Sequence, residues 1–206
     1  MMRKLIKPLA LLTLFGAGGF LVVASCLYLY LNPKLPSVEE LKEIELQIPL
    51  RIYSQDLKVI AEFGEKKRSP VSFDEIPQSM IDAFLAAEDD SFFEHGGIVV
   101  TGLLRAALQL VTTGQIQSGG STITMQVARN FFLNNRQEFT RKFNEILLAF
   151  RIEDGLTKEE ILSLYTNKIY MGNRAYGVGA AAHVYYGKDL KDLTLAETAM
   201  IAGLPK

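Results

Sequence analysis

The stretch that decides the fold is EDDSFFEHGG at residues 88–97, which continues the apolar helical run MIDAFLAA at residues 80–87. From Ile76 onward, apolar residues recur with helical spacing, and glycine-bearing breaks divide the chain into about five to seven helices. These breaks lie near residues 96, 114, 119, 155, 172 and 187. Residues 76–206 are therefore predicted to form one mainly α domain.

Glu88 stands where the apolar run ends, so its carboxylate is expected to emerge from an apolar surface. A partly desolvated carboxylate suits a general base. The alternative is an exposed helix-end glutamate without a chemical role. Asp89 is expected to hold backbone or arginine contacts. His95 is expected to hold the turn by hydrogen bonding, because a chain with two histidines gives little support for a zinc site.

A second stretch, GGSTITMQVARN at residues 119–130, carries the signs of a helix start. Ser121 and Thr122 stand where an N-cap belongs, and the glycines before them would let the backbone approach a ligand closely. The free amides of a helix N-terminus suit a phosphate group. Further along, Gln126 and then Arg129 or Asn130 share a helix face with Thr122. An ordinary capped amphipathic helix is the alternative.

Three further motifs follow, namely RKFNE at 141–145, KEEILSLYTN at 158–167, and RAYGVGAAA at 174–182 with YYGK at 185–188. With the first two, they resemble the five signature motifs of the peptidoglycan glycosyltransferases, in order, over residues 85–206. Upstream, LQIP at 46–49, IYS at 52–54 and GEKKR at 64–68 resemble bifunctional class A penicillin-binding proteins of the 1A type. The resemblance implies a lysozyme-like α fold with a cleft between two lobes, C-terminally incomplete and truncated before the transpeptidase domain.

The resemblance also implies a reaction, the polymerisation of lipid II by inverting transfer from an undecaprenyl-pyrophosphate donor to the acceptor 4-hydroxyl. Glu88 and Glu145 would be the catalytic carboxylates, with Glu88 as the base and Glu145 positioning cations or substrate. Arg141 would neutralise the pyrophosphate. The remaining substrate-binding residues would be Ser121, Thr122, Gln126, Arg129, Asn130, Tyr165 and Asn167, with Tyr170 also framing the cleft.

Spacing gives two expectations about the third motif, and the first two motifs depart from the family pattern at three positions. Arg141 and Glu145 are four residues apart, so they could pair on one helix face. Lys142 is turned away from Arg141 by about 100° and is expected to point elsewhere. The second motif of the family usually ends in two glutamines, whereas this chain has Met125 and then Gln126. Gly96 and Val99 also replace residues that are commonly histidine and aspartate in the family.

Residues 9–31 contain no charged residue. A helix of this length is sufficient to cross the roughly 30 Å hydrocarbon layer of a bilayer. We predict one signal-anchor helix here. Arg3, Lys4 and Lys7 precede it, so residues 1–8 are expected in the cytoplasm and the catalytic part on the periplasmic face of the bacterial inner membrane. A cleaved secretory signal and a lipoprotein signal ending at Cys26 are the alternatives.

Residues 32–75 are predicted to form a linker and a small β region. Two prolines in NPKLPS, at residues 32–37, would stop a helix, and Ser37 begins a capping-box pattern for a short one. Alternating apolar and polar residues on both sides of Ser54-Gln55-Asp56 predict a β-hairpin. Capping boxes at Thr157 and Thr194 predict two later helix starts.

Composition narrows the class of function. A net charge of −1 argues against a nucleic-acid partner, and one cysteine excludes an intrachain disulfide. No serine has a lysine three residues later, so transpeptidase activity is not expected. No cofactor is required, although a Mg or Mn ion is compatible with oxygen ligands. The alternatives to the transferase are a lysozyme-like glycan-cleaving enzyme and an inactive membrane-anchored fragment.

Overall fold

The computed structural model describes residues 15–16, 18–19, 21–23, 25–42, 49–56, 59–114, 120–133 and 138–205. The chain divides into two compact units, Met1–Pro36 and Ser37–Lys206.

The first unit contains the predicted membrane segment. Its described residues between 15 and 31 are helical, and the short 3-10 helix η1 (Asn32–Lys34) follows at the predicted proline stop. Residues 1–8, and residues 9–14, 17, 20 and 24 of the predicted span, lie outside the described residues. Within the part of the chain that the structure describes, no helix has the length and apolarity that a membrane crossing requires.

The second unit begins with a short helix and a hairpin. Helix α2 (Glu39–Lys42) precedes the antiparallel strands β1 (Leu50–Tyr53) and β2 (Val59–Phe63). Leu50 pairs with Phe63, which confirms the predicted hairpin.

A second sheet was not predicted from the sequence. Strand β3 (Lys67–Arg68) pairs in parallel with β4 (Ala175–Tyr176), more than a hundred residues later in the chain.

Seven α-helices follow in the described residues beyond Ile76, which confirms the mainly α prediction. They are α3 (Gln78–Glu88), α4 (Val100–Thr113), α5 (Ile123–Phe132), α6 (Glu138–Gly155), α7 (Lys158–Lys168), α8 (Val178–Tyr186) and α9 (Leu195–Ala202). The 3-10 helices η2 (Phe73–Glu75) and η3 (Leu190–Asp192) precede α3 and α9. Both predicted capping boxes are present, at Thr157 before α7 and at Thr194 before α9.

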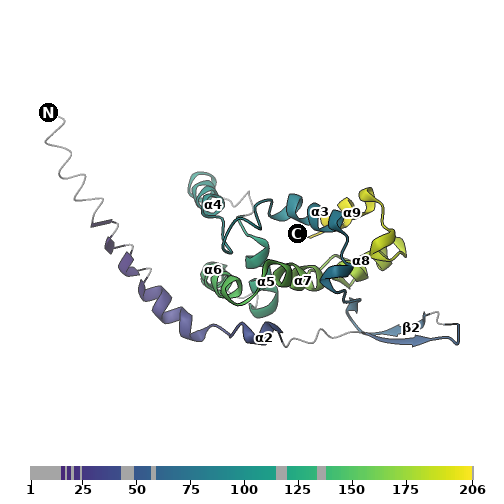
Figure 1. Ribbon diagram of the computed structural model, residues 1–206. Coiled ribbons are helices and arrows are strands. Elements are labelled where there is room, and N and C mark those ends of the chain that lie inside the picture. Colours follow the sequence, from purple (N-terminus) through teal and green to yellow (C-terminus); the bar gives the residue numbers. More distant parts are fainter. Residues whose placement is uncertain are drawn as a thin grey trace. The chain divides into compact units, whose positions relative to one another are not determined.

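Helix α5 is the centre of the core. It packs against both α6 and α7, and α3 packs against α9 (Figure 1). All residues from Ile123 to Ala128 are buried, so this helix has almost no solvent-facing side in its first two turns. Burying each large apolar side chain contributes about 1.5–3 kcal/mol. The first half of α5 is therefore a rigid support for any side chain that it presents.

One aromatic contact connects α3 to α7. The rings of Phe84 and Tyr165 meet edge to face with centroids 5.6 Å apart, and neither side chain is exposed. Glu88 lies one turn after Phe84 on the same face of α3. The packing of Phe84 on Tyr165 therefore fixes the end of α3 that carries Glu88.

Candidate functional site

Glu88 is the last residue of α3 and is half-buried. Its Oε2 atom accepts a hydrogen bond of 2.7 Å from Nε2 of Gln126 on α5. Two predicted site residues that are 38 positions apart in sequence thus meet directly. The neighbouring Met125 is fully buried in the core. The methionine that departs from the family pattern therefore does not face the carboxylate.

The start of α5 is anchored to the loop that follows Glu88. Thr122 is the N-cap, and its Oγ1 accepts from the Met125 amide at 3.1 Å and donates to the Gly97 carbonyl at 2.6 Å. Oδ2 of Asp89 accepts from the Ile123 amide at 3.0 Å. The predicted N-cap and the predicted backbone role of Asp89 are both confirmed. One first-turn amide is consequently occupied by a protein carboxylate.

The loop of residues 89–97 is held by His95. Its Nε2 lies 3.0 Å from both carboxylate oxygens of Asp89, and its Nδ1 accepts from the Gly97 amide at 3.1 Å. Nδ1 must be unprotonated to accept, so Nε2 carries the hydrogen toward Asp89. Lys158 donates to the His95 carbonyl at 2.7 Å. These bonds confirm the structural role predicted for His95.

Gly120 packs closely against α4. A Cβ at this position would lie 3.0 Å from the Gly102 carbonyl oxygen of α4. The missing side chain therefore lets the loop pack against α4. Gly119 lies outside the described residues.

Ser121, Lys142, Glu145 and Arg141 form one polar chain. Lys142 donates to Ser121 Oγ at 2.6 Å and lies 3.2 Å from Oε2 of Glu145, which is 2 % exposed. Nε of Arg141 lies 3.5 Å from the other oxygen of Glu145, so the predicted pair is confirmed. The expectation that Lys142 points elsewhere was wrong, because residues three apart also share a helix face. Glu145 thus holds two cations rather than one.

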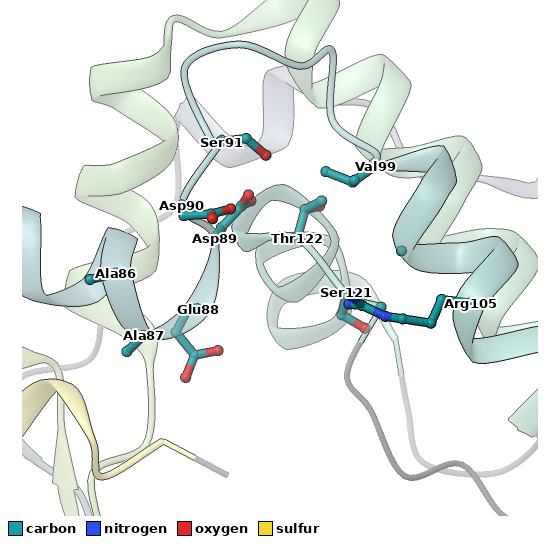
Figure 2. A pocket seen from close by; sticks show the side chains of 12 residues that line it. Ala86, Ala87, Glu88, Asp89, Asp90, Ser91, Val99, Arg105, Ser121 and Thr122 are labelled. Carbon is teal, nitrogen blue, oxygen red and sulfur yellow. The ribbon is translucent and has the colours of Figure 1, made fainter. Parts of the chain in front are cut away.

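Glu88 lines a hollow of about 240 Å³ with Ser121 and Thr122 (Figure 2). The opposite wall comes from Gly102 and Arg105 of α4 and from Val99, the N-cap residue of that helix. Arg105 was missed by the sequence analysis. It is the one charged residue in α4, and a lone cation in an apolar helix is the signal that could have identified it.

A second hollow, of about 560 Å³, is lined by both of the predicted arginines. Arg129, Asn130 and Arg141 line it, together with Tyr170. Arg129 lies three residues after Gln126 on α5, a rise of about 4.5 Å along the helix. Helix α5 therefore presents both the donor that holds Glu88 and one of the two arginines, while Arg141 comes from α6.

Tyr165 lies between these groups. Its hydroxyl is enclosed and has no hydrogen-bond partner among the described residues. Burial raises the pKa of Tyr165, the charge of Glu88 raises that pKa further, and the charge of Arg129 lowers it. The phenol therefore stays protonated and interacts electrostatically with both the carboxylate and the cation.

The side-chain amide of Asn167 forms its hydrogen bonds within the protein. Its amide nitrogen donates to the carbonyls of Val71 and Ser163 at 2.8 and 2.9 Å, and its oxygen accepts from the Val71 amide at 2.9 Å. Both N–H groups of the side chain are thus engaged within the protein. In the tertiary structure, the hydrogen bonds of Asn167 with Val71 hold the segment before η2 in place.

The described residues contain no group of three or more histidine, cysteine, aspartate or glutamate side chains that could hold a metal ion. The Mg or Mn ion considered from the sequence stays a prediction. The arrangement offers one half-buried carboxylate held by an amide donor, and cations nearby. Such a set can accept a proton and stabilise a developing negative charge.

The chain is similar to known proteins over most of its length. A family model described as Transglycosylase matches residues 56–206. The chain is 63% identical over 188 residues to penicillin-binding protein 1A of Pseudomonas aeruginosa, covering 91% of this chain and 23% of that protein. It is 54% identical over 193 residues to penicillin-binding protein 1A of Escherichia coli, covering 94% and 22%. The chain thus spans less than a quarter of these curated relatives.

Among solved structures, a crystal structure of penicillin-binding protein 1A from Haemophilus influenzae is 35% identical, with a TM-score of 0.39. The match covers 79% of this chain and 14% of that chain.

Proposed function

Because this chain belongs to the transglycosylase family, we propose that it is a peptidoglycan glycosyltransferase that polymerises lipid II in cell wall synthesis. The observation that carries this proposal is the hydrogen bond between Glu88 and Gln126, on the helix that also presents Arg129. This contact sets a candidate base next to a cationic hollow. A lysozyme-like arrangement of the lobes is part of the proposal.

The reaction proceeds by inverting displacement at the anomeric carbon of the donor sugar. The 4-hydroxyl oxygen of the acceptor attacks that carbon, and the new glycosidic bond forms as the bond to pyrophosphate breaks. The leaving pyrophosphate takes the electron pair of the broken bond. Glu88 takes the hydroxyl proton as general base, a contribution typically worth about 10²–10⁴-fold in rate. Gln126 holds the carboxylate in one orientation.

The leaving group binds in the second hollow. Arg129 and Arg141 line it, and Arg141 is oriented by the buried Glu145. Fixed cations stabilise the charge that develops on pyrophosphate without reorganisation during the reaction. Arg105, in the hollow of Glu88, supplies positive charge on the acceptor side. Ser121, Thr122, Asn130 and Tyr165 complete the binding residues, and the substrate role predicted for Asn167 has no support in its contacts.

The membrane is the natural location of both lipid-linked substrates. We infer that residues 9–31 anchor the chain in the bacterial inner membrane, with residues 1–8 cytoplasmic and the catalytic domain periplasmic. We also infer the division into a linker and β region at 32–75 and a catalytic domain at 76–206.

An apolar stripe on α4 supports a second contact with the bilayer. Val100, Leu104, Leu108 and Val111 recur at helical spacing and are between 58% and 84% exposed. Exposed apolar stripes of this kind mark membrane or partner contacts. Because α4 also lines the hollow of Glu88, this contact would hold the acceptor side of the site at the bilayer surface.

The test is polymerisation of lipid II by the purified chain in detergent, with Glu88→Gln and the exposed Glu94→Gln as a matched pair. We expect Glu88→Gln to lose at least about 10²-fold in rate and Glu94→Gln to keep the wild-type rate. Equal rates for the two variants would remove the assigned base. Parallel incubation with finished sacculi separates a transferase from a glycan-cleaving enzyme, since only the latter releases fragments.

A further inference from the structure

Three cations gather beside the small parallel sheet, outside the two hollows. Arg68 of β3 is in register with Tyr176 of β4. Lys66 Nζ lies 5.5 Å and Arg68 Cζ 5.3 Å from the centroid of the Tyr176 ring. Lys168 ends α7 next to β4, because the amide of Gly177 donates to the carbonyl of Ile169 at 2.8 Å. The topology thus brings Lys66, Arg68 and Lys168, the basic cluster, to one tyrosine.

Among the described residues, the basic cluster has no carboxylate as a counter-charge. Arg68 is 5 % exposed, and its Nε atom is enclosed without a hydrogen-bond partner. In the described part of the chain, none of the three cations forms an ion pair with a carboxylate. Burial lowers the pKa of Lys168, and the charges of Arg68 and Lys66 lower that pKa further. A buried cation without a partner is costly, and a bound anion would offset that cost.

The basic cluster adjoins the hollow proposed for pyrophosphate. The ring of Tyr176 packs on the ring of Tyr170 with centroids 4.9 Å apart, and Tyr170 lines that hollow. On the other side, Lys168 Nζ lies 4.4 Å from the ring centroid of Phe131, two residues after Arg129 on α5. One pair of aromatic rings therefore separates the basic cluster from the arginines of the proposed site.

We propose that Lys66, Arg68 and Lys168 form an oxyanion subsite that binds a carboxylate of the peptide branches on the glycan strand. This inference rests on the proposed function. Pyrophosphate is assigned to Arg129 and Arg141, so a second group of cations calls for a second anion on the same substrate. The sugars of the glycan strand are uncharged. The carboxylates of the strand are carried by its peptide branches. The exposed ring of Tyr170 offers an apolar face between the two sites.

The test is direct binding of two soluble probes to the full chain in detergent, measured by calorimetry. The probes are a lipid-free disaccharide-peptide with free carboxylates and the same compound with its carboxylates amidated. Wild type should bind the free form about 10-fold more tightly. Lys66→Gln and Lys168→Gln should each remove most of this preference, while Lys191→Gln on η3, also an exposed lysine, should keep it. Lys66 is exposed, so its variant tests the inference without disturbing the core.

Equal affinity of wild type for both probes would overturn the subsite. So would an equal weakening of both probes by Lys66→Gln and Lys168→Gln, or a loss of inorganic pyrophosphate binding in these variants with the carboxylate preference intact. Polymerisation of lipid II is measured separately. A wild type that polymerises lipid II but does not distinguish the probes contradicts the subsite alone, whereas one that distinguishes them but does not polymerise contradicts the proposed function alone.

Discussion

At the scale of single residues, the orientation of Glu88 depends on one donor. Gln126 Nε2 reaches its carboxylate at 2.7 Å from a helix whose first two turns are buried, so the donor is itself held in place. A carboxylate kept in one rotamer can meet the acceptor hydroxyl without first paying for its own ordering.

Replacing Gln126 should therefore affect the chemical step. We expect Gln126→Ala to lower kcat by about 10–100-fold, because a misplacement of about 1 Å can cost that much. The measurement is the steady-state rate of lipid II polymerisation. Met125→Leu is the matched control, since this neighbour packs in the core and the change conserves volume. A Gln126→Ala variant as fast as Met125→Leu would contradict the positioning role.

Tyr165 offers a second test at the residue scale. Its enclosed hydroxyl has no partner among the described residues, so Tyr165→Phe should raise the melting temperature. The polymerisation rate should fall by about 10-fold, because the phenol dipole acts on both Glu88 and Arg129. Thermal unfolding and initial rates measured on one preparation check both parts. A lower melting temperature with an unchanged rate would show a purely structural tyrosine.

At the scale of elements, glutamate side chains cap the starts of α7 and α9. In the capping box of α9, the carboxylate of Glu197 accepts a hydrogen bond of 2.7 Å from the Thr194 amide. It accepts another, also of 2.7 Å, from Nζ of Lys188. The hydrogen bond from Lys188 is the larger cause, and the Thr194 amide the second, of a pKa of Glu197 below its ordinary value.

This shift predicts a pH-dependent stability. A carboxyl group with a lowered folded pKa stabilises the protein above its unfolded pKa, about 4.3, and that contribution is lost as the pH falls through the folded value. Glu197→Gln should lower the melting temperature at about pH 7 and lower it less at about pH 3, where the carboxyl group is closer to its protonated form. Thermal unfolding at the two pH values measures this. An equal decrease at both would assign the effect to packing instead of charge.

At the scale of the whole molecule, the apolar stripe on α4 is the proposed contact of the catalytic domain with the bilayer. The chain contains no tryptophan, so one introduced residue reports on its own location. Leu108→Trp in a nanodisc with brominated lipids should show strong fluorescence quenching, because the stripe is proposed to enter the bilayer. Leu195→Trp, at a residue that is also exposed but lies on α9, should be quenched much less. Similar quenching at both positions would contradict a specific contact through α4.

Local features were accessible from the sequence. Helical periodicity after Ile76, the hairpin on either side of residues 54–56, and the caps at Thr157 and Thr194 were predicted and are present. The family was also evident from five ordered motifs and is confirmed by the comparisons. Each of these signals involves only a few neighbouring residues, and the spacing of such residues determines their hydrogen bonds and side-chain contacts.

The meeting of distant residues depended on the tertiary structure. Packing of α6 and α7 against α5, and of α3 on α7 and α9, brings Glu88 to Gln126 and Lys142 to Ser121. The position of α4 adds Arg105 to the hollow of Glu88. The tertiary structure also turns Asn167 toward Val71 and pairs β3 with β4. The physical reason is that spacing defines which face of a helix a side chain occupies, whereas only the packing of helices and strands defines what that face meets.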